Sequence, residues 1–146
     1  LGGYNNALDY ISQSFTVPAS HPYLHFYYYI NSEDYCSDPY TAYDYGYIVV
    51  NDTTLAYAPL CETNNSTDWG HYALNLSAYA GKKVTLRFQA ETDGSLLSDF
   101  YIDTVFVSAS ESYATDMGSF LHGSPTGVEI QTLLEGTGLK KKDINR

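Results

Sequence analysis

The sequence predicts an all-β fold, an antiparallel β-sandwich, on three observations. Segments in which apolar and polar residues alternate recur from the start of the chain to about residue 108, and turn-forming clusters separate them. The chain has sixteen tyrosines and six phenylalanines, whose rings fit a pleated, half-buried surface. No segment with the helical period competes with these strands. At 146 residues, the chain suits one domain with one core.

Each predicted strand is an alternating segment that ends at a cluster of turn-forming residues. In chain order, we expect strands at 9–17, 23–30, 43–50, 54–59, 71–76, 84–90 and 100–107. The turn clusters between them are 18–22, 51–52, 64–68, 80–83 and 93–95.

Two of these strands carry the clearest apolar faces. Because side chains alternate across a strand, every second residue lies on the same face of the sheet. We expect the core to be built from two such rows: Leu24, Phe26, Tyr28 and Ile30, and Val84, Leu86, Phe88 and Ala90.

The composition changes after residue 108, where Ser, Gly and Thr become dominant. We therefore expect the sandwich to occupy 1–108, followed by a linker or extended arm at 109–127. Residues 128–146 form a tail, in which 128–134 can add one more strand or a short helix. The tail ends in basic residues: Lys140, Lys141, Lys142 and Arg146.

The charge of the chain bears on its partners. The formal net charge is -10, and four of the seven basic residues lie in the basic tail, so the body is more acidic still. Such a body repels phosphate backbones and anionic membranes, and it concentrates cations. We expect no nucleic-acid partner and no membrane insertion. The alternative is that the charge only makes the surface soluble.

The cysteines and asparagines indicate an extracellular or cell-surface address. Cys36 and Cys61 have no zinc-type spacing, so a disulfide is the expected pairing, and it would form in an oxidising compartment. Two free thiols in a cytosolic protein are the alternative. Four asparagines stand in glycosylation triplets, a pattern that also arises by chance: Asn51, Asn64, Asn65 and Asn75.

Several short segments carry a family resemblance. They are LGGYNNALD (1–9), LHFYYYI (24–30), YDYGYIVVN (43–51), Trp69 with LNLSAYAGK (74–82), VTLRF (84–88) and SDFYIDTV (98–105). In order and spacing, they resemble a jelly-roll module of secreted bacterial and archaeal proteins, found beside immune-inhibitor-A-type peptidases and related to MAM domains and carbohydrate-binding modules. The resemblance runs from residue 1 to about 108, and it implies a jelly-roll sandwich whose first strand is missing. A missing strand leaves an open sheet edge, which another chain or the chain's own tail can pair with.

The resemblance also implies a structural calcium ion held by Asp103 in the last strand. Asp9 and Asp44 are expected to supply further carboxylates, and Asn5 and Asn6 to supply amide oxygens, because Ca²⁺ takes six to eight oxygen ligands. The alternative is that Asp103 accepts backbone hydrogen bonds or faces water.

Rows of tyrosine predict a binding surface. If the core rows point inward, alternation places Tyr27 and Tyr29 on the opposite face, and Tyr43, Tyr45 and Tyr47 share a face of their own strand. Outward tyrosines can stack on sugar rings or pack against a protein. The alternative is a sheet covered on both sides, which would bury one row. Trp69 is expected to pack in the core or at its edge.

Motifs for catalysis are absent from the sequence. The four histidines are scattered, and neither HExxH nor GxSxG occurs. Carboxylate pairs such as Asp99 with Asp103, or Glu33 with Asp34, have no fixed separation and are expected to be solvated. We therefore expect a non-catalytic module that binds a glycan or a protein. The alternative is a structural subunit that self-associates through the open sheet edge and the C-terminal tail.

Overall fold

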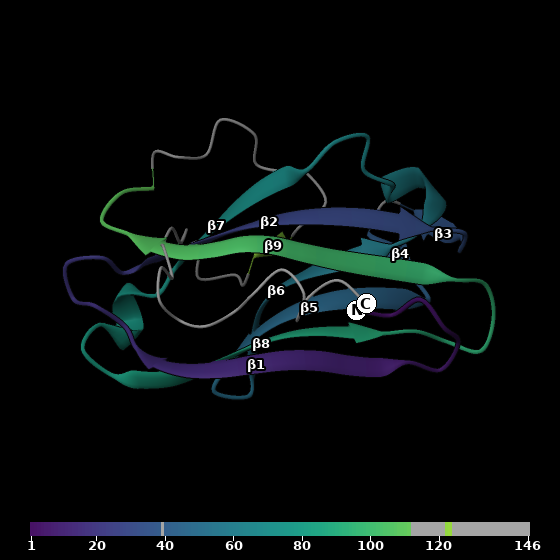
Figure 1. Cartoon of the computed structure of the whole chain (residues 1–146). Coiled ribbons are helices and arrows are strands. Elements are labelled where there is room, and N and C mark those ends of the chain that lie inside the picture. Colours follow the sequence, from purple (N-terminus) through teal and green to yellow (C-terminus); the bar gives the residue numbers. More distant parts are fainter. Residues whose placement is uncertain (39, 112–121, 124–146) are drawn as a thin grey trace.

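Two antiparallel sheets lie face to face in the computed structural model, which describes residues 1–38, 40–111 and 122–123 (Figure 1). The larger sheet has the order β1 (Leu8–Thr16), β8 (Lys83–Glu91), β5 (Asp44–Val50), β6 (Thr53–Leu60) and β10 (His122–Gly123). The smaller sheet has the order β7 (Gly70–Asn75), β2 (Tyr23–Ser32) and β9 (Ser98–Ser108). The remaining elements are the hairpin of β3 (Cys36–Asp38) and β4 (Thr41–Ala42) and two short 3-10 helices, η1 (Glu62–Asn64) and η2 (Ser77–Tyr79).

The all-β prediction is confirmed, and all seven predicted strands are present within two residues at either end. Strands β3, β4 and β10 were not predicted. Each is only two or three residues long, which is too short for an alternating pattern to be visible. The predicted linker (109–127) and tail (128–146) lie outside the described residues, apart from 109–111 and 122–123.

The core lies between the sheets and contains both predicted rows. Phe26 of β2 meets Phe88 of β8 edge to face, with ring centroids 5.0 Å apart, so the two rows interlock across the interface. Gly46 faces the core from β5, where a Cβ atom would lie only 2.6 Å from the Phe100 ring. A side chain at residue 46 would therefore push Phe100 out of place.

Both ends of the described chain pair with sheet edges. Residues 1–3 run along the start of β9, where Gly2 bridges to Asp99 and the amide of Phe100 donates to the Leu1 carbonyl at 2.8 Å. At the other sheet, β10 pairs antiparallel with residues 56–57 of β6.

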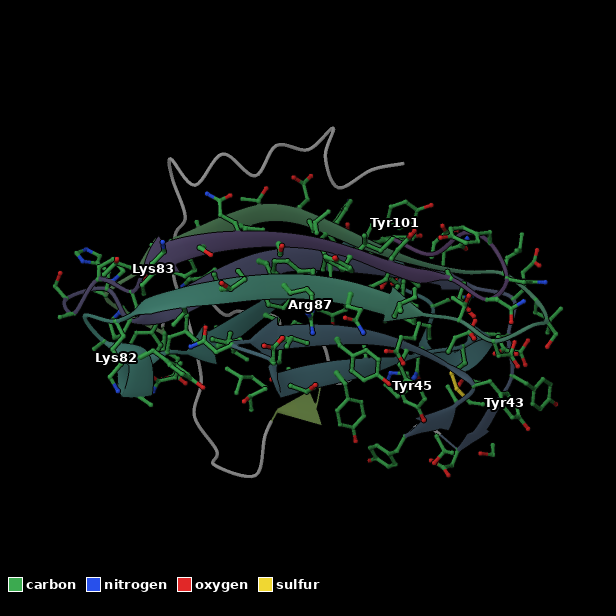
Figure 2. All side chains as sticks on the ribbon, turned by 90° about the horizontal axis from the view of Figure 1, so that it is seen from below. Tyr43, Tyr45, Lys82, Lys83, Arg87 and Tyr101 are labelled. Carbon is green, nitrogen blue, oxygen red and sulfur yellow. A yellow bond between two sulfur atoms is a disulfide. The ribbon has the colours of Figure 1, made fainter. Side chains whose placement is uncertain are left out.

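One end of the sandwich gathers acidic side chains. The antiparallel register pairs Ser32 with Ser98, and Asp44 with Leu60, so the loops that follow β2, β6 and β8 meet there. We call this the acidic end, and its members are Glu33, Asp34, Asp38, Asp44, Glu62, Glu91, Asp93 and Asp99. Lys82 and Lys83 lie at the opposite end (Figure 2).

A disulfide fastens the acidic end. Cys36 of β3 is bonded to Cys61, which directly follows β6, and their Cα atoms are 5.5 Å apart. The predicted pairing is therefore confirmed, and it indicates an oxidising environment.

No helix in the described part of the chain is both long and apolar enough to cross a membrane.

Candidate functional site

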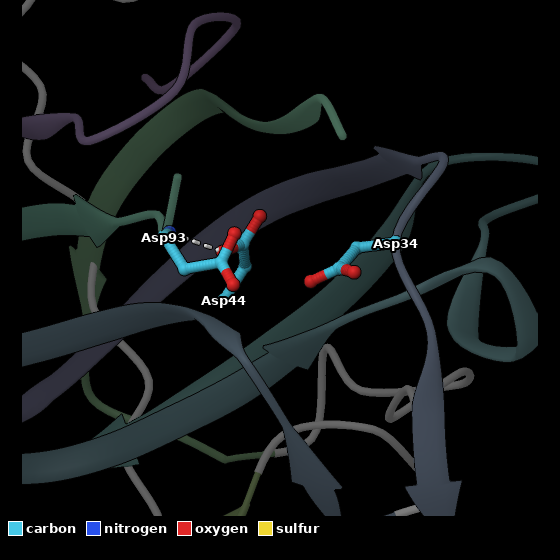
Figure 3. A group of neighbouring side chains, drawn as sticks. All are labelled: Asp34, Asp44 and Asp93. Carbon is cyan, nitrogen blue, oxygen red and sulfur yellow. Dashed lines mark hydrogen bonds between the residues drawn. The ribbon is translucent and has the colours of Figure 1, made fainter. Parts of the chain in front are cut away.

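Three aspartates converge at the acidic end (Figure 3). Asp34 follows β2, Asp44 begins β5, and Asp93 lies in the loop after β8. Each offers a carboxylate oxygen, and these oxygens all lie within 4.8 Å of one another. Segments that are distant in sequence thus place three negative charges around one point.

Hydrogen bonds hold two of these carboxylates in position. The backbone amide of Asp93 donates to Asp44 Oδ1 at 2.6 Å, and that of Tyr35 donates to Asp34 Oδ1 at 2.7 Å. Asp34 is 2% exposed and Asp44 is 0% exposed. Their second oxygens, Oδ2, are buried and have no hydrogen-bond partner among the described residues. Buried polar atoms are nearly always paired, so these two oxygens require an explanation.

The surroundings of Asp44 work against its negative charge. Burial is the largest cause and raises its pKa above 3.8, and the nearby carboxylates of Asp34 and Asp93 raise the pKa further. The Asp93 amide, which donates to Asp44 Oδ1, and the nearby Ser98 hydroxyl lower the pKa and oppose this effect. A cation bound among the three carboxylates would remove both the repulsion and the unsatisfied oxygens.

Calcium is one of the hard cations that this donor set could hold. Ca²⁺ binds oxygen at about 2.3 to 2.6 Å, so two oxygens on one ion lie at most about 5 Å apart. The 4.8 Å spread meets that limit. The donors are all hard carboxylate oxygens, whereas zinc favours nitrogen and sulfur, and magnesium usually keeps several waters.

Of the predicted metal ligands, only Asp44 belongs to this cluster. Asp9 is buried in β1 and accepts a hydrogen bond from the Tyr4 hydroxyl at 2.8 Å. Asp103 lies in β9 opposite Tyr27, and its Oδ1 accepts from the Thr104 amide at 2.7 Å. This contact matches the alternative stated for Asp103, a carboxylate that accepts a backbone hydrogen bond.

The two predicted asparagine ligands lie beside the loop that carries Asp93. The backbone N–H of Asn6 donates to the Asp93 carbonyl at 2.6 Å, and the side-chain Nδ2 of Asn5 donates to the Gly94 carbonyl at 3.2 Å. They therefore support the loop through its backbone.

Asp34 and Asp93 were not predicted as ligands, and the expectation that Asp34 is solvated was wrong, because Asp34 is 2% exposed. Both lie in acidic, turn-rich loops, where exposed aspartates are common, so neither has a local signal that separates it from its neighbours. Only the sheet register brings them to Asp44.

Aromatic side chains gather on the outer face of the smaller sheet. Tyr29 contacts both Trp69 and Tyr101, with centroid distances of 5.8 and 6.2 Å. Tyr27 packs on His71 at 4.8 Å. Trp69 is 36% exposed, so this ring lies at the surface. Tyr27 and Tyr29 are half-buried, with the core row of β2 on the opposite face, as alternation predicts.

A second aromatic group lies on the outer face of the larger sheet. Tyr45 contacts Tyr47 at 5.9 Å and Tyr57 at 6.1 Å, whereas Tyr43 stands exposed just before β5. Figure 2 shows Tyr43 and Tyr45 near the acidic end, away from Lys82. Burial, with help from Glu91 and Tyr45, raises the pKa of Tyr47 to about 12.

A chain of hydrogen bonds links Ser108, His25 and His71. His25 Nδ1 lies 2.6 Å from His71 Nε2, and His25 Nε2 lies 3.3 Å from Ser108 Oγ. The order resembles a nucleophile, a base and an orienting group. However, the Ser108 hydroxyl also donates to the Ser110 carbonyl at 2.7 Å, a shorter contact than its 3.3 Å contact with His25. His25 is also fully buried between the rings of His71 and Phe106, which suits a packing role.

The predicted glycosylation sites differ in their surroundings. Asn51 is exposed in the turn between β5 and β6, and Asn65 is also exposed. Asn64 is buried, and its Nδ2 donates to the Pro59 carbonyl at 3.1 Å. Asn75 is half-buried at the end of β7.

Searches with this sequence found no matching family model and no significantly similar curated protein.

Proposed function

We propose that this chain is a non-catalytic, extracellular binding module of the jelly-roll type, which is stabilised by calcium and binds a glycan. The observation that carries the proposal is the row of aromatic rings on the outer face of the smaller sheet, where Tyr29 contacts both Trp69 and Tyr101. A sandwich does not need these rings for its core. Flat rings at a surface match the apolar faces of sugars.

Calcium belongs to the proposal as a structural ion at Asp34, Asp44 and Asp93. The buried, unpartnered oxygens of Asp34 and Asp44 support this assignment. The ion would join the loops after β2 and β8 to the start of β5, so it would order the acidic end and take no part in a reaction.

The extracellular address is supported by the disulfide between Cys36 and Cys61. Free calcium is also abundant outside cells, where weak calcium sites of extracellular modules are filled.

The experiment is a binding screen of the purified chain against immobilised neutral and acidic polysaccharides, with calcium or with EGTA. We expect retention on at least one neutral polysaccharide and weaker retention in EGTA. Absence of retention on every polysaccharide in calcium would contradict the proposal.

The second candidate function is a structural subunit in which a tail strand completes a sandwich. The pairing of β10 with the edge of β6 favours it, because this short strand belongs to the predicted arm (109–127) and pairs with a sheet edge. Light scattering on the full chain and on a chain ending at residue 108 tests the idea. Assembly of the full chain alone supports it, and a strictly monomeric full chain contradicts it.

A further inference from the structure

A β-bulge interrupts the pairing of β2 with β9. Tyr27 pairs with Asp103, but His25 pairs with Phe106, so β9 has one extra residue opposite Phe26. Thr104 lies in the bulge with a φ of 48°, in the left-handed region that β-branched residues rarely adopt. Such strain persists only where the surrounding structure imposes it, and it is concentrated at functional sites.

The bulge lies beside a hollow in the surface of the smaller sheet. Tyr27, Trp69, Asp103 and Thr104 line this hollow, whose open volume is about 470 Å³. The size falls within the range of small-molecule sites, about 300 to 1,000 Å³. The hollow therefore has room for a sugar ring and part of its neighbours.

Each side of the hollow is held in place. Tyr29 packs against Trp69, and His71 packs against Tyr27, so a second ring supports each aromatic wall. The Thr104 amide and hydroxyl both donate to Asp103 Oδ1, at 2.7 and 3.4 Å, which orients the carboxylate at the rim. A site with supported walls loses little conformational freedom when a ligand binds.

We propose that this hollow binds a neutral pyranose residue of a glycan, an inference that rests on the function proposed above. Trp69 and Tyr27 would contact the C–H face of the ring, and Asp103 would accept hydrogen bonds from its hydroxyl groups. The acidic body of the protein selects against sulfated and uronate-rich glycans, since it repels anions.

Trp69 is the only tryptophan in the chain, so its fluorescence reports on this hollow directly. The experiment titrates the full chain, with calcium present, with neutral gluco-, manno-, xylo- and galacto-oligosaccharides and with sulfated oligosaccharides. We expect one neutral series to change the emission of Trp69 with saturation and the sulfated series to leave it unchanged. Choline is titrated in parallel, because an aromatic site with a carboxylate can also bind a quaternary ammonium ion.

The variants Tyr27→Ala and Asp103→Asn should each weaken sugar binding by roughly tenfold or more. Asp103→Asn keeps the shape of the side chain, so it tests the hollow even if Tyr27→Ala folds poorly. Tyr10→Ala, at an exposed tyrosine of β1 in the other sheet, is the matched control and should bind as the wild type does. Tyr45→Ala tests the other predicted tyrosine row.

The outcomes separate the two proposals. If a sugar binds but leaves the emission of Trp69 unchanged, the glycan binds elsewhere, and only the assignment of the hollow as the binding site is overturned. The same conclusion follows if Tyr45→Ala abolishes sugar binding and Asp103→Asn does not. Saturation by choline without any sugar response overturns the sugar assignment. If no oligosaccharide binds in the titration and no polysaccharide retains the wild-type chain in the screen, the proposed function itself is overturned.

Discussion

At the scale of single residues, Asp44 connects stability to the metal site. Its carboxylate is fully buried and lies near two other negative charges, so burial and repulsion raise its pKa. A raised pKa in the folded state means that folding favours the protonated form. Without a metal, this group therefore lowers the free energy of unfolding as the pH rises above 3.8.

We expect Asp44→Asn to be at least as stable as the wild type in EGTA and to lose the stabilisation by calcium. The wild type should gain about 2.7 kcal/mol when calcium is in hundredfold excess over its Kd. Thermal unfolding with and without calcium measures both effects. Asp103→Asn is the control and should be stabilised by calcium as much as the wild type is. If only Asp103→Asn loses this stabilisation, the ion binds at Asp103, as the resemblance implied.

His71 makes stability depend on pH in the opposite direction. Burial lowers its pKa below 6.5, so the unfolded chain binds a proton more readily than the folded one does. The stability that depends on neutral His71 is thus complete above pH 6.5 and is lost as the pH falls below it. Urea unfolding at pH 7.5 and pH 5.5 should show a lower free energy of unfolding at pH 5.5.

His71→Gln should reduce this difference, and His21→Gln should leave it unchanged. His21 is the matched control because it is exposed, and its Nδ1 lies 2.7 Å from the hydroxyl of neighbouring Ser20. An undiminished difference in His71→Gln would assign the pH dependence to other groups.

At the scale of elements, the bulge in β9 stores backbone strain at Thr104. Glycine adopts the left-handed region without a steric penalty, so we expect Thr104→Gly to raise the free energy of unfolding by about 1 kcal/mol. Thr16→Gly, at the regularly paired end of β1, should lower it by a similar amount. Urea unfolding compares the two variants, and equal destabilisation by both would show that Thr104 is not strained.

The disulfide restrains the acidic end as well as the whole fold. It closes a loop with a sequence separation of 25, for which chain entropy predicts about 3 to 4 kcal/mol of stability. Cys36 lies two residues after Asp34, and Cys61 directly follows the partner of Asp44. We therefore expect the double variant Cys36→Ser with Cys61→Ser to lose this stability and to bind calcium more weakly in isothermal titration calorimetry. Unchanged calcium affinity would show that the loops are positioned without the disulfide.

At the scale of the whole molecule, calcium should order one end of the sandwich. Hydrogen exchange measured by mass spectrometry compares the chain in calcium and in EGTA. We expect greater protection in calcium at 33–38, 40–43 and 92–97, the loops that flank the three aspartates. The turns at 18–22 and 80–82, at the far end, should exchange equally in both conditions. A uniform change along the chain would indicate general stabilisation without a local site.

The two candidate sites differ in how far the sequence predicted them. Tyr27 and Tyr29 were placed correctly on an outer face because the apolar row of β2 fixes which side is buried. Asp34 and Asp93 were missed, since loop aspartates carry no periodic signal. Trp69 was expected to pack at the core or its edge, and its exposure at the hollow depends on β7 lying beside β2.

The alternating pattern by itself determined that this chain is all-β, where its seven main strands lie and which faces of β2 and β8 contribute to the core. These properties are local, because side chains two residues apart share a face of any strand. Tertiary structure decided which loops meet, where β9 gains its extra residue and which aspartates share one point. Those features depend on the register between distant strands, and a shift of one residue would move Asp103 to the other face and separate Asp44 from Asp93.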